Sequence, residues 1–123
     1  MVARMNVAIL GLSNNPTRYA FRAARQLHQA GHAVWGIHPE RPAVPDATMV
    51  GSIDELPADI HTLTIYLAEA RSEPLADAIA GYGFARAIFN PGAENHALME
   101  KLAGAGVETV EGCTLVMLRT STF

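Results

Sequence analysis

Short runs of apolar residues alternate along this chain with longer stretches in which apolar residues recur at helical spacing. A short apolar run between polar turns is typical of a buried strand, and apolar residues at i, i+3 and i+4 indicate a helix with one buried face. The runs predict strands over residues 5–10, 33–38, 48–50, 61–67, 85–89 and 107–110. The longer stretches predict helices over residues 18–30, 72–82 and 94–105. We expect the apolar segment 114–118 to extend or follow the last strand.

Strands separated by helices are typical of the α/β class, because parallel strands need a crossover connection that a helix supplies. We expect a single Rossmann-like domain over residues 1–123. Its sheet should hold about five mainly parallel strands in the order 3-2-1-4-5, with helices on both faces. No linker, repeat or low-complexity tract divides the sequence.

Ligands of open parallel sheets bind beyond the carboxyl ends of the strands, near the point where the strand order reverses. The loops that follow the predicted strands are therefore the candidate site. They cover residues 11–18, 38–41, 67–71, 90–95 and 112–113.

The loop over residues 11–18 has the character of a phosphate-binding loop. It leads from a strand into a helix, so that backbone N–H groups and the positive end of the helix dipole face the same place. Gly11 allows close approach of a ligand, and Arg18 adds a charge suited to phosphate. The dinucleotide fingerprint would require glycine at the positions of Ser13 and Pro16. The loop therefore favours a phosphate-bearing ligand other than the usual dinucleotide.

Two further loops have alternative interpretations. An NAD-binding fold would have an acidic residue at the end of the second strand, but this chain has His38-Pro39 there and Glu40 only after it. Arg41 meets a second phosphate group or lies free in solvent. The turn over residues 90–92 either lines the ligand site or serves only to start the next helix.

Composition excludes several function classes. A formal net charge of −3 argues against nucleic-acid binding, although eight of the nine basic residues are arginine. The chain has no apolar run long enough to span a membrane and no metal-ligand spacing. The single cysteine, Cys113, fits a reducing cytoplasm, and no neighbour in sequence would activate its thiol. We expect a cytoplasmic protein whose partner is a small-molecule nucleotide.

Residues 7–19, 31–39, 90–95 and 112–113, taken in order, resemble the small single-domain CoA-binding proteins. These look like the CoA-binding Rossmann-like domain of the succinyl-CoA synthetase α subunit. The resemblance implies that coenzyme A or an acyl-CoA lies across the carboxyl ends of the strands. It implies that the phosphates are held by Gly11, Ser13, Asn14 and Arg18. It places beside the adenosine and the adjoining strand end the residues Pro39, Arg41, Tyr66 and Leu67. The turn of Asn90, Pro91 and Gly92 would close the cleft, and the candidate set is completed by Asn15, Pro16 and His38.

Three positions depart from the family pattern. Leu12 stands where the family commonly has a small residue, His38 where it usually has asparagine, and Glu40 intervenes before the basic residue. These departures leave open whether the chain retains CoA binding.

The phosphohistidine machinery and the partner domain of the synthetase have no counterpart among the matching residues, so the resemblance implies binding without catalysis. We expect a non-enzymatic CoA-binding protein. The alternatives are an NAD(P)-binding enzyme or redox sensor on the same fold, and a regulatory interaction protein that has lost its ligand. The tail over residues 116–123 either covers the sheet of its own chain or packs on a second subunit, so a homodimer remains one option.

Overall fold

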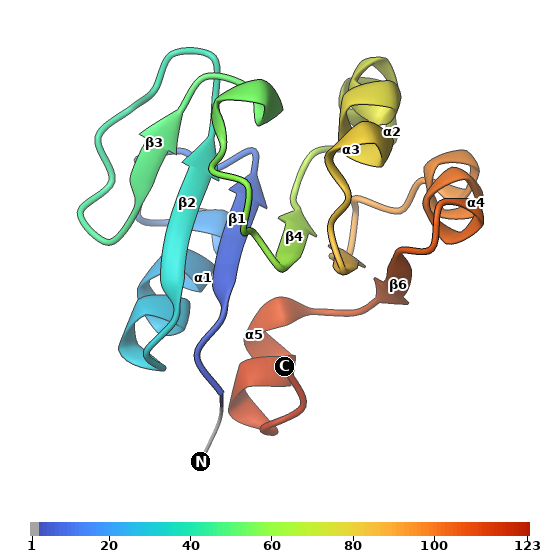
Figure 1. Cartoon of the computed structure of the whole chain (residues 1–123). Helices are drawn as coiled ribbons and strands as arrows, with labels where there is room; N and C mark the ends of the chain where they lie inside the picture. The colour runs from blue at the N-terminus through green and yellow to red at the C-terminus, as the bar shows by residue number, and fades with distance from the viewer. Residues whose placement is uncertain (1–2) are drawn as a thin grey trace.

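The computed structural model describes residues 3–123, in which strands and helices alternate as the sequence predicts (Figure 1). In chain order the elements, with η for short 3₁₀ helices, are β1 (Asn6–Leu10), α1 (Tyr19–Gln29), β2 (Ala33–Ile37), β3 (Thr48–Val50), η1 (Ile53–Glu55), β4 (Thr62–Ile65), α2 (Glu69–Ser72), η2 (Glu73–Leu75), α3 (Ala76–Tyr82), β5 (Arg86–Phe89), α4 (His96–Gly104), β6 (Glu108–Glu111) and α5 (Thr114–Arg119). Within this described part of the chain, no helix is long and apolar enough to cross a membrane.

The strands form one parallel sheet in the order β3-β2-β1-β4-β5-β6. The chain runs outward from β1 to β3 and then returns to β4, so the strand order reverses beside β1. This confirms the predicted fold class and the order 3-2-1-4-5. The sheet has six strands, one more than the expected count of about five, and the sixth strand, β6, lies at the edge beside β5.

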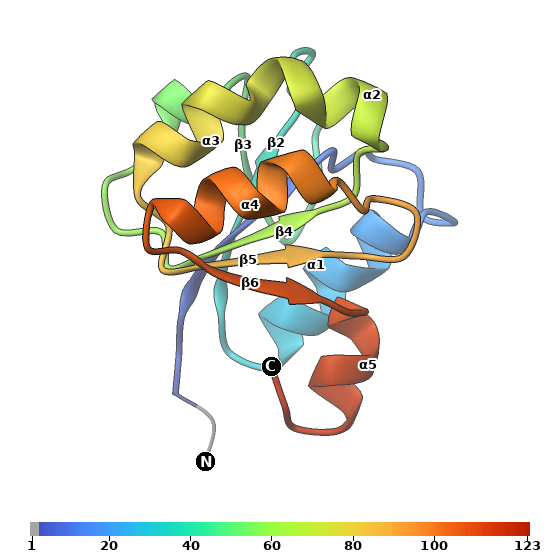
Figure 2. The same ribbon diagram turned by 90° about the vertical axis from the view of Figure 1, so that its right-hand side faces the viewer.

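Helices cover both faces of the sheet, with α1 and α5 on one face and α2, α3 and α4 on the other (Figure 2). The alternation of side chains along β1 feeds both layers. Val7 and Ile9 pack into the cluster around α1, whereas Ala8 and Leu10 pack into the cluster around α3 and α4. A central strand buried on both faces reads as a continuous apolar run, which explains why β1 was predictable.

The segment after β6 differs from the expectation. Residues 114–118 form the helix α5 rather than an extension of the strand. Thr114 is its only fully buried residue, and Leu115 and Leu118 pack against the cluster around α1. Spacing of i and i+3 places these two leucines on one helical face. The helical segment predicted over residues 72–82 begins earlier, at Glu69, so most of the predicted loop over residues 67–71 is helix. The segment is divided into α2, η2 and α3, with Pro74 in the 3₁₀ turn.

Candidate functional site

The loops after β1, β2, β4 and β5 meet at the carboxyl end of the sheet (Figure 2). Each loop begins by continuing the hydrogen-bond ladder of its strand. Gly11 N–H donates to the carbonyl of Ile37 at 3.1 Å, and Tyr66 N–H donates to that of Leu10 at 3.0 Å. Asn90 N–H donates to the carbonyl of Ile65 at 3.3 Å. The predicted site residues therefore lie along one end of the molecule.

Gly11 makes the turn out of β1, and its backbone φ of 92° is the left-handed conformation that favours glycine. A Cβ atom at this position would lie 2.8 Å from Cδ2 of Leu67. The first loop therefore packs directly on the loop after β4. A larger residue at this position would have to displace the Leu67 side chain and would be strained in the left-handed conformation.

The loop before α1 is shaped by its own polar side chains. Asn15 Oδ1 accepts hydrogen bonds from the Thr17 N–H at 3.0 Å and the Thr17 hydroxyl at 2.7 Å. The Ser13 hydroxyl accepts a bond from the Asn15 N–H at 3.3 Å. Pro16 is exposed in the turn that leads to the helix.

Hydrogen-bond donors at this loop are left open. Across residues 3–123, the backbone N–H groups of Ser13 and Asn14 have no protein acceptor. Arg18 caps α1 in an extended conformation, and its side chain is exposed. No acidic residue lies in the first turn of α1 to balance the helix dipole. This arrangement can receive an anion.

Leu12 does not project into this loop's open side. Its side chain is fully buried in the cluster around α1, and a Cβ atom on Gly36 would lie 2.5 Å from its Cδ2 atom. Gly36 in β2 thus provides the room that Leu12 occupies. The departure from the family pattern at Leu12 therefore lies in the core and leaves the open side of the loop over residues 11–18 unobstructed.

His38 reproduces the turn that asparagine would make. Its carbonyl accepts a hydrogen bond from the Arg41 N–H at 3.0 Å, and its Nδ1 atom accepts one from the Glu40 N–H at 3.1 Å. An asparagine oxygen makes the same contact with the N–H two residues later. The bond assigns the proton of the neutral imidazole to Nε2. Pro39 is exposed at the tip of this turn.

Arg41 is neither free in solvent nor alone. Its guanidinium forms an ion pair with Glu55, in which Nη2 lies 2.7 Å from both carboxylate oxygens. Hydrogen bonding to Arg41 lowers the pKa of the Glu55 carboxyl, and the same contact raises the pKa of Arg41. Sequence analysis considered a phosphate group or solvent as the partner of Arg41, and it did not predict the ion pair with Glu55.

Asn90 is buried and holds the carboxyl end of the sheet together. Its Nδ2 atom donates to the Thr64 hydroxyl at 2.7 Å and to the carbonyl of Ile65 at 2.9 Å. Its Oδ1 atom accepts the first N–H of α5, that of Thr114, at 2.9 Å. The side chain of Asn90 is therefore used by the fold, and only Pro91 and Gly92 of this turn are exposed.

Tyr66 lies beside this polar cluster, and its hydroxyl is buried. Within residues 3–123 that hydroxyl has no partner within hydrogen-bonding geometry, although the Thr64 and Thr114 hydroxyls, which bond each other at 2.8 Å, lie close enough to influence it. Burial raises the pKa of Tyr66 to about 12. The phenol is therefore neutral at physiological pH.

Sequence analysis missed Glu55 and Thr114 as partners of candidate site residues. The pattern Ser52-Ile53-Asp54-Glu55 indicates a capped turn, but it does not reveal that the turn folds against Arg41. The segment predicted as strand concealed Thr114 as the start of a helix. Among residues 3–123, no group of three or more His, Cys, Asp or Glu side chains could hold a metal ion.

A family model described as a CoA binding domain matches residues 5–119. Among solved structures, an uncharacterised protein is 35% identical with a TM-score of 0.90, and the match covers 99% of this chain and 100% of that one. A hypothetical protein from Pyrococcus horikoshii OT3 is 19% identical with a TM-score of 0.87, covering 95% and 83%. The enzyme WbmH from Bordetella bronchiseptica, solved with NAD⁺, is 15% identical with a TM-score of 0.56, covering 87% and 54%. A search of curated protein sequences gave no match.

Proposed function

The chain belongs to the CoA binding domain family, and we propose that it binds coenzyme A or an acyl-CoA without catalysing a reaction of its own. The observation that carries this proposal is the pair of open backbone donors at Ser13 and Asn14, beside the positive end of α1. A pyrophosphate placed there would accept hydrogen bonds from both N–H groups and would be attracted by the positive charge of Arg18.

The topology would direct the two halves of such a ligand toward opposite halves of the sheet. The strand order reverses between β2 and β4, so loops on either side of the phosphate site belong to different halves of the sheet. We propose that the adenosine lies toward the loop after β2 and the pantetheine toward the loops after β4 and β5. Leu67, which packs on Gly11, would then form the floor between them.

We propose that the protein catalyses no reaction, because the thiol at this end of the sheet has no group to activate it in the part of the chain that the structure describes. Cys113 is partly buried and caps the six-residue helix α5. A nucleophilic cysteine needs a base or a positive environment, and within residues 3–123 no hydrogen bond or ion pair joins Cys113 to a basic side chain. We also propose a cytoplasmic location, which suits a sole cysteine kept as a thiol.

Calorimetric titration of the full chain with CoA tests the proposal. We expect saturable binding and a rise in melting temperature, and native mass spectrometry of the purified protein should show a bound CoA species. No heat and no thermal shift at millimolar CoA would contradict the proposal. NADH serves as the competing ligand, and binding of NADH that CoA fails to displace would favour a dinucleotide-dependent protein.

A further inference from the structure

The loop after β2 is where Rossmann-like folds discriminate the ribose of an adenine nucleotide. An acidic side chain there accepts a bond from a ribose hydroxyl, whereas an arginine accommodates a ribose phosphate. In this chain the arginine on that loop is Arg41. What the loop recognises therefore depends on whether the guanidinium of Arg41 is available.

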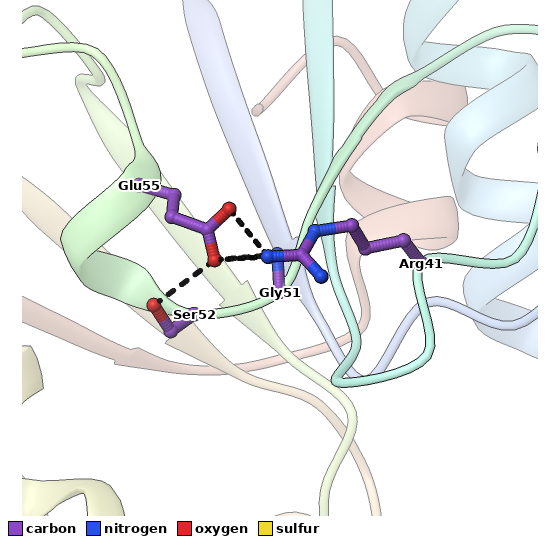
Figure 3. A network of polar contacts seen from close by, with 4 residues as sticks. All are labelled: Arg41, Gly51, Ser52 and Glu55. Carbon is purple, nitrogen blue, oxygen red and sulfur yellow. Dashed lines mark hydrogen bonds and ion pairs between the residues drawn. The ribbon is translucent and has the colours of Figure 1, made fainter.

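The guanidinium of Arg41 is held by Glu55 (Figure 3). Nη2 donates to both carboxylate oxygens at 2.7 Å, and the pair joins the loop after β2 to the turn η1 after β3. Because both contacts are short and charge-assisted, the pair places a full negative charge against the arginine.

Glu55 is itself fixed by its neighbours. Its Oε2 atom accepts hydrogen bonds from the Gly51 N–H at 3.2 Å and from the Ser52 hydroxyl at 3.4 Å. A Cβ atom on Gly51 would lie 2.7 Å from Cζ and Nη2 of Arg41, so glycine is needed for the guanidinium to lie there.

The backbone holds the other end of the Arg41 side chain. Arg41 adopts a φ of 46°, a left-handed conformation that is uncommon for a residue with a side chain. Its N–H closes the turn by donating to the His38 carbonyl at 3.0 Å. The turn therefore directs the side chain toward Glu55, and the two ends of the contact are set independently.

We propose that Glu55 masks Arg41, so that this site accepts adenine nucleotides with and without a phosphate on the ribose about equally well. The inference rests on the proposed function, because it specifies which CoA-type ligands the same site takes. A ribose phosphate near Arg41 would meet the Glu55 carboxylate as well, and repulsion from that charge offsets attraction to the guanidinium. The 3′-phosphate of CoA would therefore add little affinity over dephospho-CoA.

The test is a calorimetric comparison of CoA with dephospho-CoA on the full chain and on Glu55→Gln. We expect the wild-type dissociation constants to agree within about threefold, and the variant to prefer CoA by about tenfold or more, as a charge-assisted bond contributes. Glu40→Gln is the matched control, because it removes one negative charge from the loop that carries Arg41 and leaves the Arg41–Glu55 pair intact. Its preference for CoA should stay near the wild-type value.

Arg41→Ala provides a second test that does not depend on the folding of Glu55→Gln. Because the charges of Arg41 and Glu55 offset each other in the wild type, removal of Arg41 leaves the Glu55 carboxylate unopposed, and the ratio of the two dissociation constants should shift in favour of dephospho-CoA. A wild-type preference for CoA above about tenfold, abolished in Arg41→Ala, would overturn the inference and keep the proposed function. Binding of neither nucleotide by the wild type would instead overturn the proposed function and the inference with it.

Discussion

The two ends of the sheet use their arginines in opposite ways. At the carboxyl end, Arg18 is exposed, caps α1 and makes no capping bond with its side chain. At the amino end, Arg86 is only 6% exposed and is held on several sides. Its Nε donates to the Thr62 hydroxyl at 3.1 Å, its Nη1 donates to the Phe123 carbonyl at 3.0 Å, and its guanidinium lies 4.5 Å from the centre of the Phe123 ring.

This difference separates side chains that serve the fold from side chains that remain available to a ligand. Burial lowers the pKa of Arg86, so a buried guanidinium is retained only where acceptors surround it. Within residues 3–123 the Arg18 side chain has no such partners, so its removal should change the stability of the fold little. Asn90 is an exception, because it lies at the carboxyl end and yet its side chain makes three hydrogen bonds within the fold.

The largest effect is expected for Asn90→Ala. This change removes three hydrogen bonds and leaves the buried N–H of Thr114 without its acceptor. We expect the free energy of unfolding to fall by about 2–4 kcal/mol, the range for a buried polar group left unsatisfied together with lost bonds. Urea denaturation of the two proteins measures the difference.

Asn14→Ala is the matched control for Asn90→Ala, because Asn14 is an exposed asparagine at the same end of the sheet. Its free energy of unfolding should stay within about 0.5 kcal/mol of the wild-type value. If the two substitutions had equal effects on stability, the distinction between bonded and open residues at this end would fail.

Arg18→Ala should have the next largest effect, on binding rather than on stability. Loss of a charge-assisted contact to phosphate is expected to weaken CoA binding by about 1–3 kcal/mol, with the melting temperature of the free protein unchanged. Arg25→Ala, on the same helix but farther from the loop, should bind CoA like the wild type. Calorimetry measures both, and unchanged affinity in Arg18→Ala would remove Arg18 from the site.

The fold was largely predictable because the sheet is buried. Continuous apolar runs such as 7–10 occur where a parallel strand is covered on both faces, and they identify strands without further information. The run over residues 115–118 is also apolar, but it is too short to show helical spacing. Its helix depends on packing beside α1, which a local pattern does not contain.

The candidate site was predictable as a set of loops and less so as a set of contacts. The carboxyl-end rule brings together loops that are distant in sequence, and the structure places them at one end. The rule gives no information on which polar side chains the fold already uses. Asn90 bonds to Thr64 across 26 positions, and Arg41 pairs with Glu55 across an intervening strand. Those pairings require the tertiary structure.

The smallest expected effect concerns His32 at the amino end, beside Arg86. His32 is buried, its Nδ1 accepts the Met5 N–H at 3.0 Å, and burial together with the charge of Arg86 lowers its pKa. A folded pKa below the unfolded value of 6.5 means that the stability contribution is full above about pH 6.5 and is lost as the pH falls through the folded pKa. We expect the free energy of unfolding to fall over that window, by less than in Asn90→Ala.

Protonation at His32 also changes the hydrogen bonding, because Nδ1 then becomes a donor facing the donor of Met5. His32→Gln keeps an acceptor for this N–H and cannot titrate, so the fall in stability just below pH 6.5 should disappear in the variant. Glu55 and Asp77, whose pKa values are lowered by Arg41 and Lys101, lose their pairs only in the more acidic range of carboxyl groups. Urea denaturation of both proteins between pH 5 and 7 measures the slope. An equal slope in the variant would show that the amino end tolerates a second positive charge beside Arg86, and the contrast between the two ends would then rest on Arg86 alone.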